Sequence, residues 1–526
     1  MTSESAASAS PHAHADRPYE WVGAWSQRRA RLTPNRVAIK EPATGSEYTY
    51  ADLDERANRT AGALRELGVE SGDRVAVLAR NRVELVDLFF ATAKTGSLLA
   101  PLSHRLPERG LAAVIGDVDP CVVVVETPFE AELIDALERS DADPAVRSLP
   151  TDDDHRYDPL DIDRQDAAFD GVETALSDPH LLLHTGGSTG TPKETVLTHG
   201  SIYWNAFNTI TSWGIRPDDV TPLVFPMFHT GGWNVLTLPF FGMGATVLLR
   251  REAHPERVLA DIDRESATTL VATPTALGEM ARHDAWDRTD LSSLRFVKSG
   301  GGRCRDHVIE AWRNRGVDFS QGYGLTEFGP NNFAMPADAP PEKADSVGVP
   351  AMCVDFRLVD DFGDAVARGE VGELELAGPA AAAGYWGDAD ADGNTFGEWV
   401  STGDLARVDA DGYVHIEGRI DDMFVSDGEN VYPQRVESAI AEHPAVEAAV
   451  VFGVSDDRLG AVPKAVVVGD DSLTLSELEA FLEPRVADFA LPVALTVTDR
   501  FPDSGTGKID RAAVKERFGP PEEGEL

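Results

Sequence analysis

Uninterrupted apolar runs alternate with amphipathic stretches along the first half of the chain. The runs at 74–78 and 121–125 are rich in Val, Ala and Leu, and amphipathic stretches follow them at 82–95 and 130–139. Similar apolar runs lie at 268–272 and 294–297. Continuous apolar runs followed by helices are typical of parallel strands that are buried on both faces. The pattern therefore predicts an α/β architecture, in which the acidic, proline-containing stretch 141–178 connects two α/β subdomains.

The hydrophobic pattern changes twice in the second half of the chain. From about 346 to 417 the helical period fades, and short apolar runs between Gly and Asp turns predict a small β-rich unit. After it an α+β rhythm returns, with helices expected at 433–443 and 475–488 and strands at 448–454, 464–468 and 494–498. We expect a large N-terminal domain of two α/β subdomains plus a small β-rich unit, followed by a small α+β C-terminal domain.

One stretch raises the question of a membrane span. Residues 220–249 contain no Asp, Glu, Lys or Arg, and a spanning helix needs only about 20 apolar residues. However, the stretch contains Pro226 and Pro239 together with His229 and Asn234. A spanning helix would leave backbone groups unsatisfied at these positions. We expect a buried strand–loop–helix segment and no membrane span.

The charge balance is strongly acidic. Lys and Arg total 47 against 89 Asp and Glu, which gives a formal net charge of −42, and only eight of the bases are lysines. Nucleic acid and anionic membrane surfaces would be repelled, so neither is expected as a partner. An acidic, lysine-poor surface is typical of proteins from a salt-filled cytoplasm and indicates a halophilic source, because at molar salt a Debye length of about 3 Å screens the self-repulsion. The alternative is an ordinary acidic protein from a GC-rich genome.

We expect the fold and any activity of this chain to need roughly molar salt, and to be lost on dialysis into low salt. Circular dichroism and turnover, recorded along one salt dilution series, test this expectation. Full activity at about 0.05 M monovalent salt would contradict a halophilic source.

Cysteine usage indicates the compartment. Cys121, Cys304 and Cys353 lie far apart without a CxxC pair, and the N-terminal residues contain no apolar core of a signal peptide. This favours a reducing cytoplasm and argues against a disulfide framework or a structural zinc site. Residues 1–18, rich in Ala, Ser and His, are expected to form a disordered tail.

The strongest local signal is a loop dense in glycine and hydroxyl groups. An apolar run ends at Leu183, and residues 185–193 read TGGSTGTPK. Glycines permit close backbone approach, successive N–H groups form an anion nest, and the lysine adds a positive charge, so the loop suits a polyphosphate. It is not the nucleoside-triphosphatase pattern GxxxxGK[ST], because Pro192 precedes the lysine and no Ser or Thr follows it.

Four later motifs add further polar chemistry. The QGYGLTE motif at 321–327 offers an aromatic face, a hydroxyl and a carboxylate that suits Mg²⁺. The TGD motif at 402–404 offers an acceptor for a ribose diol, while GRIDD at 418–422 and GTGKI at 505–509 supply cations. Five motifs in this order, over roughly Glu20 to Arg517, resemble the adenylate-forming superfamily of acyl-CoA synthetases, luciferases and peptide-synthetase adenylation domains.

The resemblance implies nucleotide-binding roles for these motifs. The phosphate loop would consist of Thr185, Gly186, Gly187, Ser188, Thr189, Gly190 and Lys193. Gly300, Gly301 and Gly302 would line the adenine pocket beside the ring of Tyr323. Thr326 and Glu327 would hold the phosphates and Mg²⁺, with Glu327 as the metal ligand, while Asp404 and Arg419 would hold the ribose.

The resemblance also implies a domain that moves. It gives an N-terminal domain at 19–419 and a mobile C-terminal domain at 420–526, with Asp421 at the hinge. Lys508 would contact the carboxylate and the α-phosphate during adenylation. The loop with Gly428 would enter the active site for thioester formation.

Three positions depart from the family pattern. Glu194 stands where a glycine usually follows the lysine, and we expect its carboxylate to point to solvent because it would repel phosphate if it pointed inward. Asp427 replaces a common glycine. Gly302-Arg303 replaces a small residue followed by proline.

Substrate selection is assigned to residues 225–234 and 328–333, whose aromatic and small side chains suit an apolar acyl group. A buried ammonium would have no acidic partner within 220–249, so an amino-acid substrate is disfavoured. The residues of these stretches resemble those of fatty-acyl-CoA ligases, which take medium- or long-chain acids, more than those of aryl-CoA ligases. His229 is either a structural aromatic residue or, as in relatives, a catalytic gate near the carboxylate.

The expected enzyme is an acid–thiol ligase that works in two steps. A small-molecule carboxylic acid attacks MgATP to give acyl-adenylate and pyrophosphate, and coenzyme A then displaces AMP. One alternative loads a carrier protein instead of coenzyme A, and another is a nucleotide-binding protein without catalysis, which intact Glu327, Asp404 and Lys508 disfavour. Mg²⁺, ATP and coenzyme A are the expected cofactor and cosubstrates, and a homodimer is left open.

Overall fold

The computed structural model describes residues 22–151, 155–185, 193–387, 395–456, 458–502 and 509–519. The expected N-terminal tail, the loop residues Gly186, Gly187, Ser188, Thr189 and Gly190, and Lys508 lie outside the described residues.

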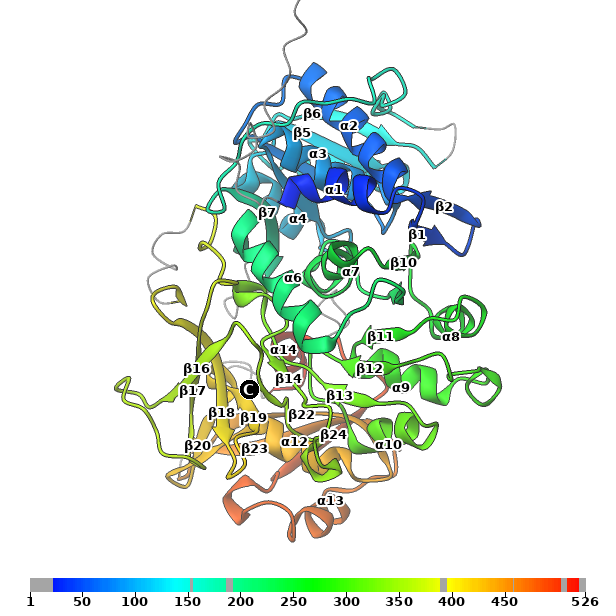
Figure 1. Cartoon of the computed structure of the whole chain (residues 1–526). Coiled ribbons are helices and arrows are strands. Elements are labelled where there is room, and N and C mark those ends of the chain that lie inside the picture. Colours follow the sequence, from blue (N-terminus) through cyan, green and yellow to red (C-terminus); the bar gives the residue numbers. More distant parts are fainter. Residues whose placement is uncertain are drawn as a thin grey trace, which may run out of the picture.

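A six-stranded sheet forms the first α/β subdomain, at the top of Figure 1. Its strands lie in the order β6 (Ala145–Leu149), β5 (Val122–Glu126), β3 (Arg74–Leu78), β4 (Leu98–Leu102), β7 (Pro179–Thr185) and β8 (Lys193–Thr198). All neighbours are parallel except β7 and β8. Alternate side chains of the strands enter two separate cores, one under α2 (Tyr50–Glu66) and α3 (Val83–Thr95), the other under α4 (Glu108–Val118) and α5 (Glu130–Leu137). The predicted doubly covered parallel strands are thereby confirmed.

Two smaller sheets make up the second subdomain. One has the order β2 (Ser46–Thr49), β1 (Val37–Glu41), β10 (Thr246–Leu249) and β9 (Val220–Leu223), and the other is a parallel set of β11 (Thr269–Ala272), β12 (Phe296–Ser299) and β13 (Phe319–Gln321). The helices of this part of the chain are α1 (Trp25–Leu32), α6 (His199–Trp213), α7 (Leu238–Met243), α8 (Pro255–Arg264), α9 (Pro274–Arg282) and α10 (Asp306–Asn314). Thr198 begins α6 with a capping box to Ser201.

The β-rich unit expected from the fading helical period is present. After the short pair β14 (Phe333–Ala334) and β15 (Val349–Pro350) comes an antiparallel meander of β16 (Asp355–Val359), β17 (Val371–Ala377), β18 (Val400–Val408) and β19 (Val414–Arg419). Side chains of β17 alternate between buried and half-buried positions, as expected for a sheet with one covered face.

The smaller C-terminal domain follows η7 (Ile420–Asp422) and lies at the bottom of Figure 1. Its sheet contains β20 (Phe424–Ser426), β21 (Glu429–Val431), β22 (Val446–Asp456), β23 (Gly460–Gly469) and β24 (Ala494–Thr498), packed with α12 (Pro433–Ala441), α13 (Leu475–Leu482) and α14 (Arg511–Phe518). The helix predicted at 475–488 ends earlier, at Leu482, because Pro484 has no N–H with which to continue the helical hydrogen bonds.

The uncharged stretch 220–249 folds into β9, η3 (Gly231–Thr237), α7 and β10. η3 is a π-helix, in which Leu238 N–H bonds to Trp233 O and the Thr237 hydroxyl donates to Gly232 O at 2.6 Å. Within the described residues, no helix is long and apolar enough to cross a membrane.

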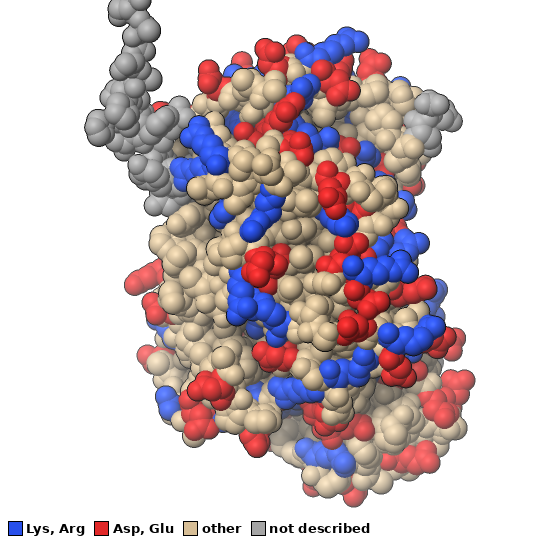
Figure 2. All heavy atoms as spheres, turned by 45° about the vertical axis from the view of Figure 1, so that its right-hand side comes forward, with Lys and Arg blue, Asp and Glu red and all other residues tan. Residues whose placement is uncertain are grey.

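Acidic and basic side chains are interspersed over the face of the molecule drawn in Figure 2. The excess of acids is therefore spread among bases on this face, and it does not form a single acidic patch there.

Two stacked histidines lie in the interior of the first subdomain. His180 on β7 and His199 at the start of α6 are 0% and 1% exposed, and their ring centroids are 4.7 Å apart. Burial and the neighbouring His199 hold the pKa of His180 well below its usual range, and burial lowers the pKa of His199 to about 4. Both rings therefore stay neutral in the folded protein at pH values where they would be protonated in the unfolded chain.

We expect the protein to lose stability as the pH falls below about 6.5, the ordinary histidine value. Below that pH the unfolded chain binds protons that the folded chain excludes, so each such histidine lowers the unfolding free energy by up to about 1.4 kcal/mol per pH unit. Urea unfolding midpoints measured from pH 7.5 to 4.5 test this. His180→Phe should flatten the dependence, whereas the exposed His254→Phe should not; equal slopes for both variants would contradict the assignment.

Candidate functional site

The two strands that flank the phosphate loop pair at their ends. Thr185 closes β7, Lys193 opens β8, and the two residues are in register, with the Thr185 hydroxyl 3.4 Å from Lys193 O. The hairpin therefore brings together both ends of a loop whose glycines and hydroxyls suit a polyphosphate. Lys193 Nζ lies 5.0 Å from the centroid of the Tyr385 ring.

The carboxylate of Glu327 is linked to this hairpin through Tyr385. Glu327 lies in η5 (Thr326–Phe328), where Thr326 is buried, and its Oε1 accepts a hydrogen bond from the Tyr385 hydroxyl at 3.2 Å. Among the described residues no three His, Cys, Asp or Glu side chains cluster as a metal site. One carboxylate fits Mg²⁺, which takes one or two carboxylates and completes its shell with substrate phosphates and water.

The residues expected at the ribose also lie together. Asp404 on β18 faces Arg419 on β19 across the ladder, and Arg419 Nη1 is 3.2 Å from Asp404 Oδ1. The Tyr323 hydroxyl donates to Asp404 Oδ2 at 2.5 Å. Burial, and then the Asp404 charge, raise the pKa of Tyr323 well above its usual value, so this hydroxyl remains a donor.

The glycines expected at the adenine follow β12. Gly300 N–H bonds to Ala272 O, and Gly322 N–H bonds to Ser299 O at 2.8 Å, so the turn before Tyr323 lies beside this segment. A Cβ at Gly300 would meet no atom within 4 Å, and Gly302 would meet only the edge of Pro274 at 3.9 Å. Gly301 has a φ of +85°, a conformation that favours glycine. This leaves room for a flat ring against the backbone.

His229 and its neighbours lie at the entry to η3. Its Nδ1 accepts a hydrogen bond from Gly231 N–H at 3.0 Å, and the preceding Phe228 packs against the rings of His104 and His184. The local bond fixes the direction of the imidazole relative to the π-helix. Whether His229 acts as a gate near the carboxylate or as a structural aromatic residue stays a prediction.

Gly428 lies in the two-residue turn between β20 and β21, with φ values of +53° at Asp427 and +82° at Gly428. Left-handed backbone at both positions matches the tight hairpin turn for which Asp-Gly is a preferred sequence. The departure at Asp427 therefore keeps the turn, because Asp tolerates this conformation better than most residues do.

Glu194 does not point to solvent, so that expectation is wrong. Its side chain is 4% exposed on β8, and its Oε1 has no hydrogen-bond partner among the described residues. Val196, on the same side of β8, packs in the core beneath α4, which shows that this helix covers the strand. Burial, and then the charge of Asp117 on α4, raise the pKa of Glu194 to about 8.

We expect Glu194→Gln to stabilise the protein at pH 8 by on the order of 3 kcal/mol, and to have little effect at pH 4.5. Between these values the carboxyl ionises in the unfolded chain but stays protonated when folded, so wild-type stability falls as the pH rises. Urea unfolding at both pH values measures the difference. The exposed Glu310→Gln on α10 is the control, and a stabilisation that is equal at both pH values would refute the explanation.

Polar contacts join the N-terminal domain to the C-terminal domain. Arg303, one of the departures from the family pattern, donates to the Ser438 hydroxyl on α12 at 2.9 Å. Glu417 on β19 binds both Arg407, at 2.6 Å, and Arg435 of α12, at 2.5 Å. Arg303 thereby contacts the smaller domain directly.

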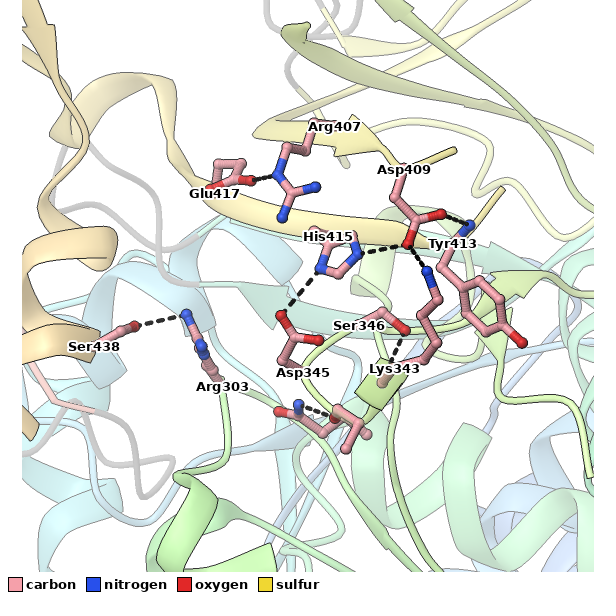
Figure 3. Close-up of polar contacts among 12 residues, drawn as sticks. Arg303, Lys343, Asp345, Ser346, Arg407, Asp409, Tyr413, His415, Glu417 and Ser438 are labelled. Atoms are coloured by element: carbon pink, nitrogen blue, oxygen red, sulfur yellow. Dashed lines mark hydrogen bonds and ion pairs between the residues drawn. The ribbon is translucent and has the colours of Figure 1, made fainter. Parts of the chain in front are cut away.

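Figure 3 shows the Arg303–Ser438 and Glu417–Arg407 contacts and, separate from them, a network around His415. The His415 ring lies between Asp345 and Asp409, with each carboxylate 3.3 Å from one ring nitrogen. Lys343 Nζ lies 2.6 Å from Asp409. Because the network ties the 343–346 segment to β19 and to Asp409, in the turn that follows β18, it supports the strands that carry Asp404 and Arg419.

One residue of the site was missed by the sequence analysis. Tyr385 contacts Glu327 and Lys193, which are 58 and 192 positions away in the sequence. No local pattern marks it, because its neighbours are a glycine and a tryptophan without a distinctive spacing. With Tyr385 included, segments far apart in the chain form two contact groups, Lys193–Tyr385–Glu327 and Tyr323–Asp404–Arg419, and the charge of Arg419 acts on Tyr385. Such a site on a two-domain α/β fold defines an enzyme that binds and activates a nucleotide.

Comparisons with known proteins identify the family. The AMP-binding enzyme model matches residues 26–386, and the AMP-binding enzyme C-terminal domain matches residues 435–508. Feruloyl-CoA synthase from an Amycolatopsis species is 37% identical over 501 residues, 95% of this chain and 99% of that protein. The long-chain-fatty-acid–CoA ligase FadD13 of Mycobacterium tuberculosis is 31% identical over 94% of this chain and 98% of its own.

A solved structure agrees with this assignment. The anthranilate CoA ligase AuaEII, crystallised with anthranoyl-AMP, matches with a TM-score of 0.87 at 27% identity, over 94% of this chain and 96% of that chain. The chain belongs to the AMP-binding enzyme family and is an ATP-dependent, AMP-forming acid–thiol ligase.

Proposed function

We propose that this enzyme converts an aromatic carboxylic acid, of the arylacrylic or benzoic class, to its coenzyme A thioester with release of AMP and pyrophosphate. The similarity to feruloyl-CoA synthase and to an anthranilate CoA ligase supports this substrate class. Two groups of contacts carry the reaction itself. Tyr385 contacts Glu327 and Lys193. Tyr323 contacts Asp404, which pairs with Arg419.

A medium- or long-chain fatty acid, favoured by the sequence of residues 225–234, is the second candidate. Its support is the 31% identity to a long-chain-fatty-acid–CoA ligase and the apolar, buried side chains of Phe225, Met227, Phe228 and Trp233. Each CH₂ buried by such a chain would add about 0.8 kcal/mol to binding.

In the first half-reaction, we assign the following roles. The phosphate loop and Lys193 hold the phosphates, Asp404 accepts hydrogen bonds from the ribose hydroxyls, and Lys508 offsets charge as the two anions meet. The acid's carboxylate oxygen attacks the α-phosphorus, and the bond to pyrophosphate breaks. Mg²⁺, when bound through Glu327, supplies charge neutralisation on the phosphates. Positioning and charge stabilisation provide the rate, since no protein nucleophile is needed.

In the second half-reaction, the sulfur of coenzyme A attacks the acyl carbon, and the carbonyl bond to AMP breaks. The smaller domain, for which we propose the boundary 420–526 and a hinge at Asp421, would turn to bring Gly428 toward the thiol. The Arg303–Ser438 and Glu417–Arg435 contacts are those that such a rotation would have to break.

The test is a panel of acids at equal concentration: 4-hydroxycinnamic, benzoic, octanoic and hexadecanoic acid. Pyrophosphate and AMP are measured with and without coenzyme A. The highest kcat/KM with an aromatic acid, together with dependence of AMP release on coenzyme A, supports the proposal. The highest value with an alkanoic acid supports the second candidate, and thioester formation only on an added carrier protein, or no AMP at all, would refute both.

We also propose that the protein is a cytoplasmic enzyme of a halophilic archaeon, because its net charge is −42 and it has only eight lysines. Light scattering in the salt series described above measures whether it forms a homodimer.

A further inference from the structure

A short segment joins the two phosphate-binding parts of the site. Ala383 N–H bonds to Val196 O at 2.9 Å, and Trp386 N–H bonds to Glu194 O at 2.8 Å, so the segment runs along β8. At its beginning, Ala382 N–H bonds to the backbone carbonyl of Glu327 at 2.8 Å. One stretch of backbone is thus bonded both to the strand that leaves the phosphate loop and to the residue that carries the metal-site carboxylate.

The Tyr385 side chain also contacts both of these parts of the site. Its hydroxyl donates to Glu327 Oε1 at 3.2 Å, and the face of its ring lies 5.0 Å from Lys193 Nζ. Phe396 packs edge-on against the same ring, with centroids 5.2 Å apart, and Tyr385 forms a β-bridge with Thr195. Backbone and ring packing therefore fix where the hydroxyl and the aromatic face point.

These two contacts act on different partners. A hydrogen bond to one carboxylate oxygen restricts rotation of the Glu327 side chain. It thereby also fixes the direction in which the second oxygen points. The ring face attracts the lysine ammonium, because a cation within about 6 Å of an aromatic centroid is stabilised by the ring quadrupole.

We propose that Tyr385 is a positioning residue for MgATP: its hydroxyl orients Glu327 toward the metal, and its ring places Lys193 beside the phosphates. The inference rests on the proposed function, in which Glu327 is the metal ligand. It assigns separate tasks to two parts of one side chain, and these can be separated by substitution.

The experiment measures ATP binding by calorimetry at increasing Mg²⁺ with no acid present, so that no turnover occurs. Tyr385→Phe should raise the half-saturating Mg²⁺ concentration about tenfold, as expected for loss of a hydrogen bond to a charged group, and should leave ATP binding without Mg²⁺ unchanged. Tyr385→Leu should weaken ATP binding without Mg²⁺ as well, because it also removes the ring. Tyr413→Phe, whose ring contacts Lys343, is the control and should match the wild type.

A double-mutant cycle distinguishes a failure of the Tyr385 positioning role from a failure of the metal assignment of Glu327, on which that role rests. If the hydroxyl acts through Glu327, the combined Glu327→Ala and Tyr385→Phe variant should need no more Mg²⁺ than Glu327→Ala alone, because Ala leaves the hydroxyl without its acceptor. Additive shifts, or a wild-type Mg²⁺ midpoint for Tyr385→Phe, would overturn the positioning role while the metal assignment stands. A wild-type midpoint for Glu327→Ala would overturn both. Thermal unfolding of each variant verifies that it is folded.

Discussion

The Lys508→Ala variant is expected to form acyl-adenylate roughly 10²–10³-fold more slowly than the wild type, because it lacks the cation that offsets charge when the carboxylate approaches the α-phosphate. Lys508 stands between Gly507 and Ile509, in a polar sequence unsuited to core packing. Isotope exchange between pyrophosphate and ATP measures this step. The same variant, given preformed acyl-adenylate and coenzyme A, should make thioester at a nearly normal rate.

Substitution of Gly428 is expected to slow the other half-reaction, thioester formation. Its φ of +82° tolerates Asn, and a Cβ there meets no atom within 4 Å, so Gly428→Asn should fold normally. If the turn approaches the thiol only after domain rotation, this variant should be slowed in thioester formation and unaffected in exchange. Equal damage to both half-reactions by Lys508→Ala would mean a single fixed geometry, and the rotation mechanism would have to be abandoned.

The Glu327→Gln variant is expected to lose about 10²-fold in adenylation at limiting Mg²⁺, since the carboxylate that holds the metal contributes several kcal/mol of charge stabilisation. Gln keeps the shape of the side chain and an acceptor for Tyr385, so the fold should survive. Exchange rates measured against Mg²⁺ concentration test this, and part of the loss should be recovered at high Mg²⁺. Wild-type exchange at limiting Mg²⁺ would show that another group holds the metal.

The strands of the parallel sheet could be predicted because each is buried on both faces. Arg74–Leu78 matches its predicted bounds, since an unbroken apolar run is typical of a doubly covered strand. Ala494–Thr498 also matches its predicted bounds, although all five of its residues are half-buried. The helix that ends at Leu482 was predicted too long, because its amphipathic period continues past Pro484, which has no N–H to donate to the preceding turn.

The candidate site was predictable only where its chemistry is local. Asp404 and Arg419 were found from their motifs, and the β18–β19 register explains why they meet. Glu194 was misjudged because a charged residue in a strand gives no sign of the helix that covers it; only α4 makes its position interior. Tyr385 could not be found, since its importance comes from contacts across the chain.

If residues 225–234 select the acyl group, as expected from their sequence, the π-helix at Gly231–Thr237 bears on how acyl specificity could change over evolution. Its hydrogen bonds span five residues, as in the bond from Leu238 N–H to Trp233 O, and therefore accommodate one residue more than an α-helix of the same span. Deleting one residue would restore the α-helical register and turn every preceding side chain by about 100° relative to α7. Insertion and deletion would thus switch the set of side chains presented by this segment in one step, where substitutions change them one at a time.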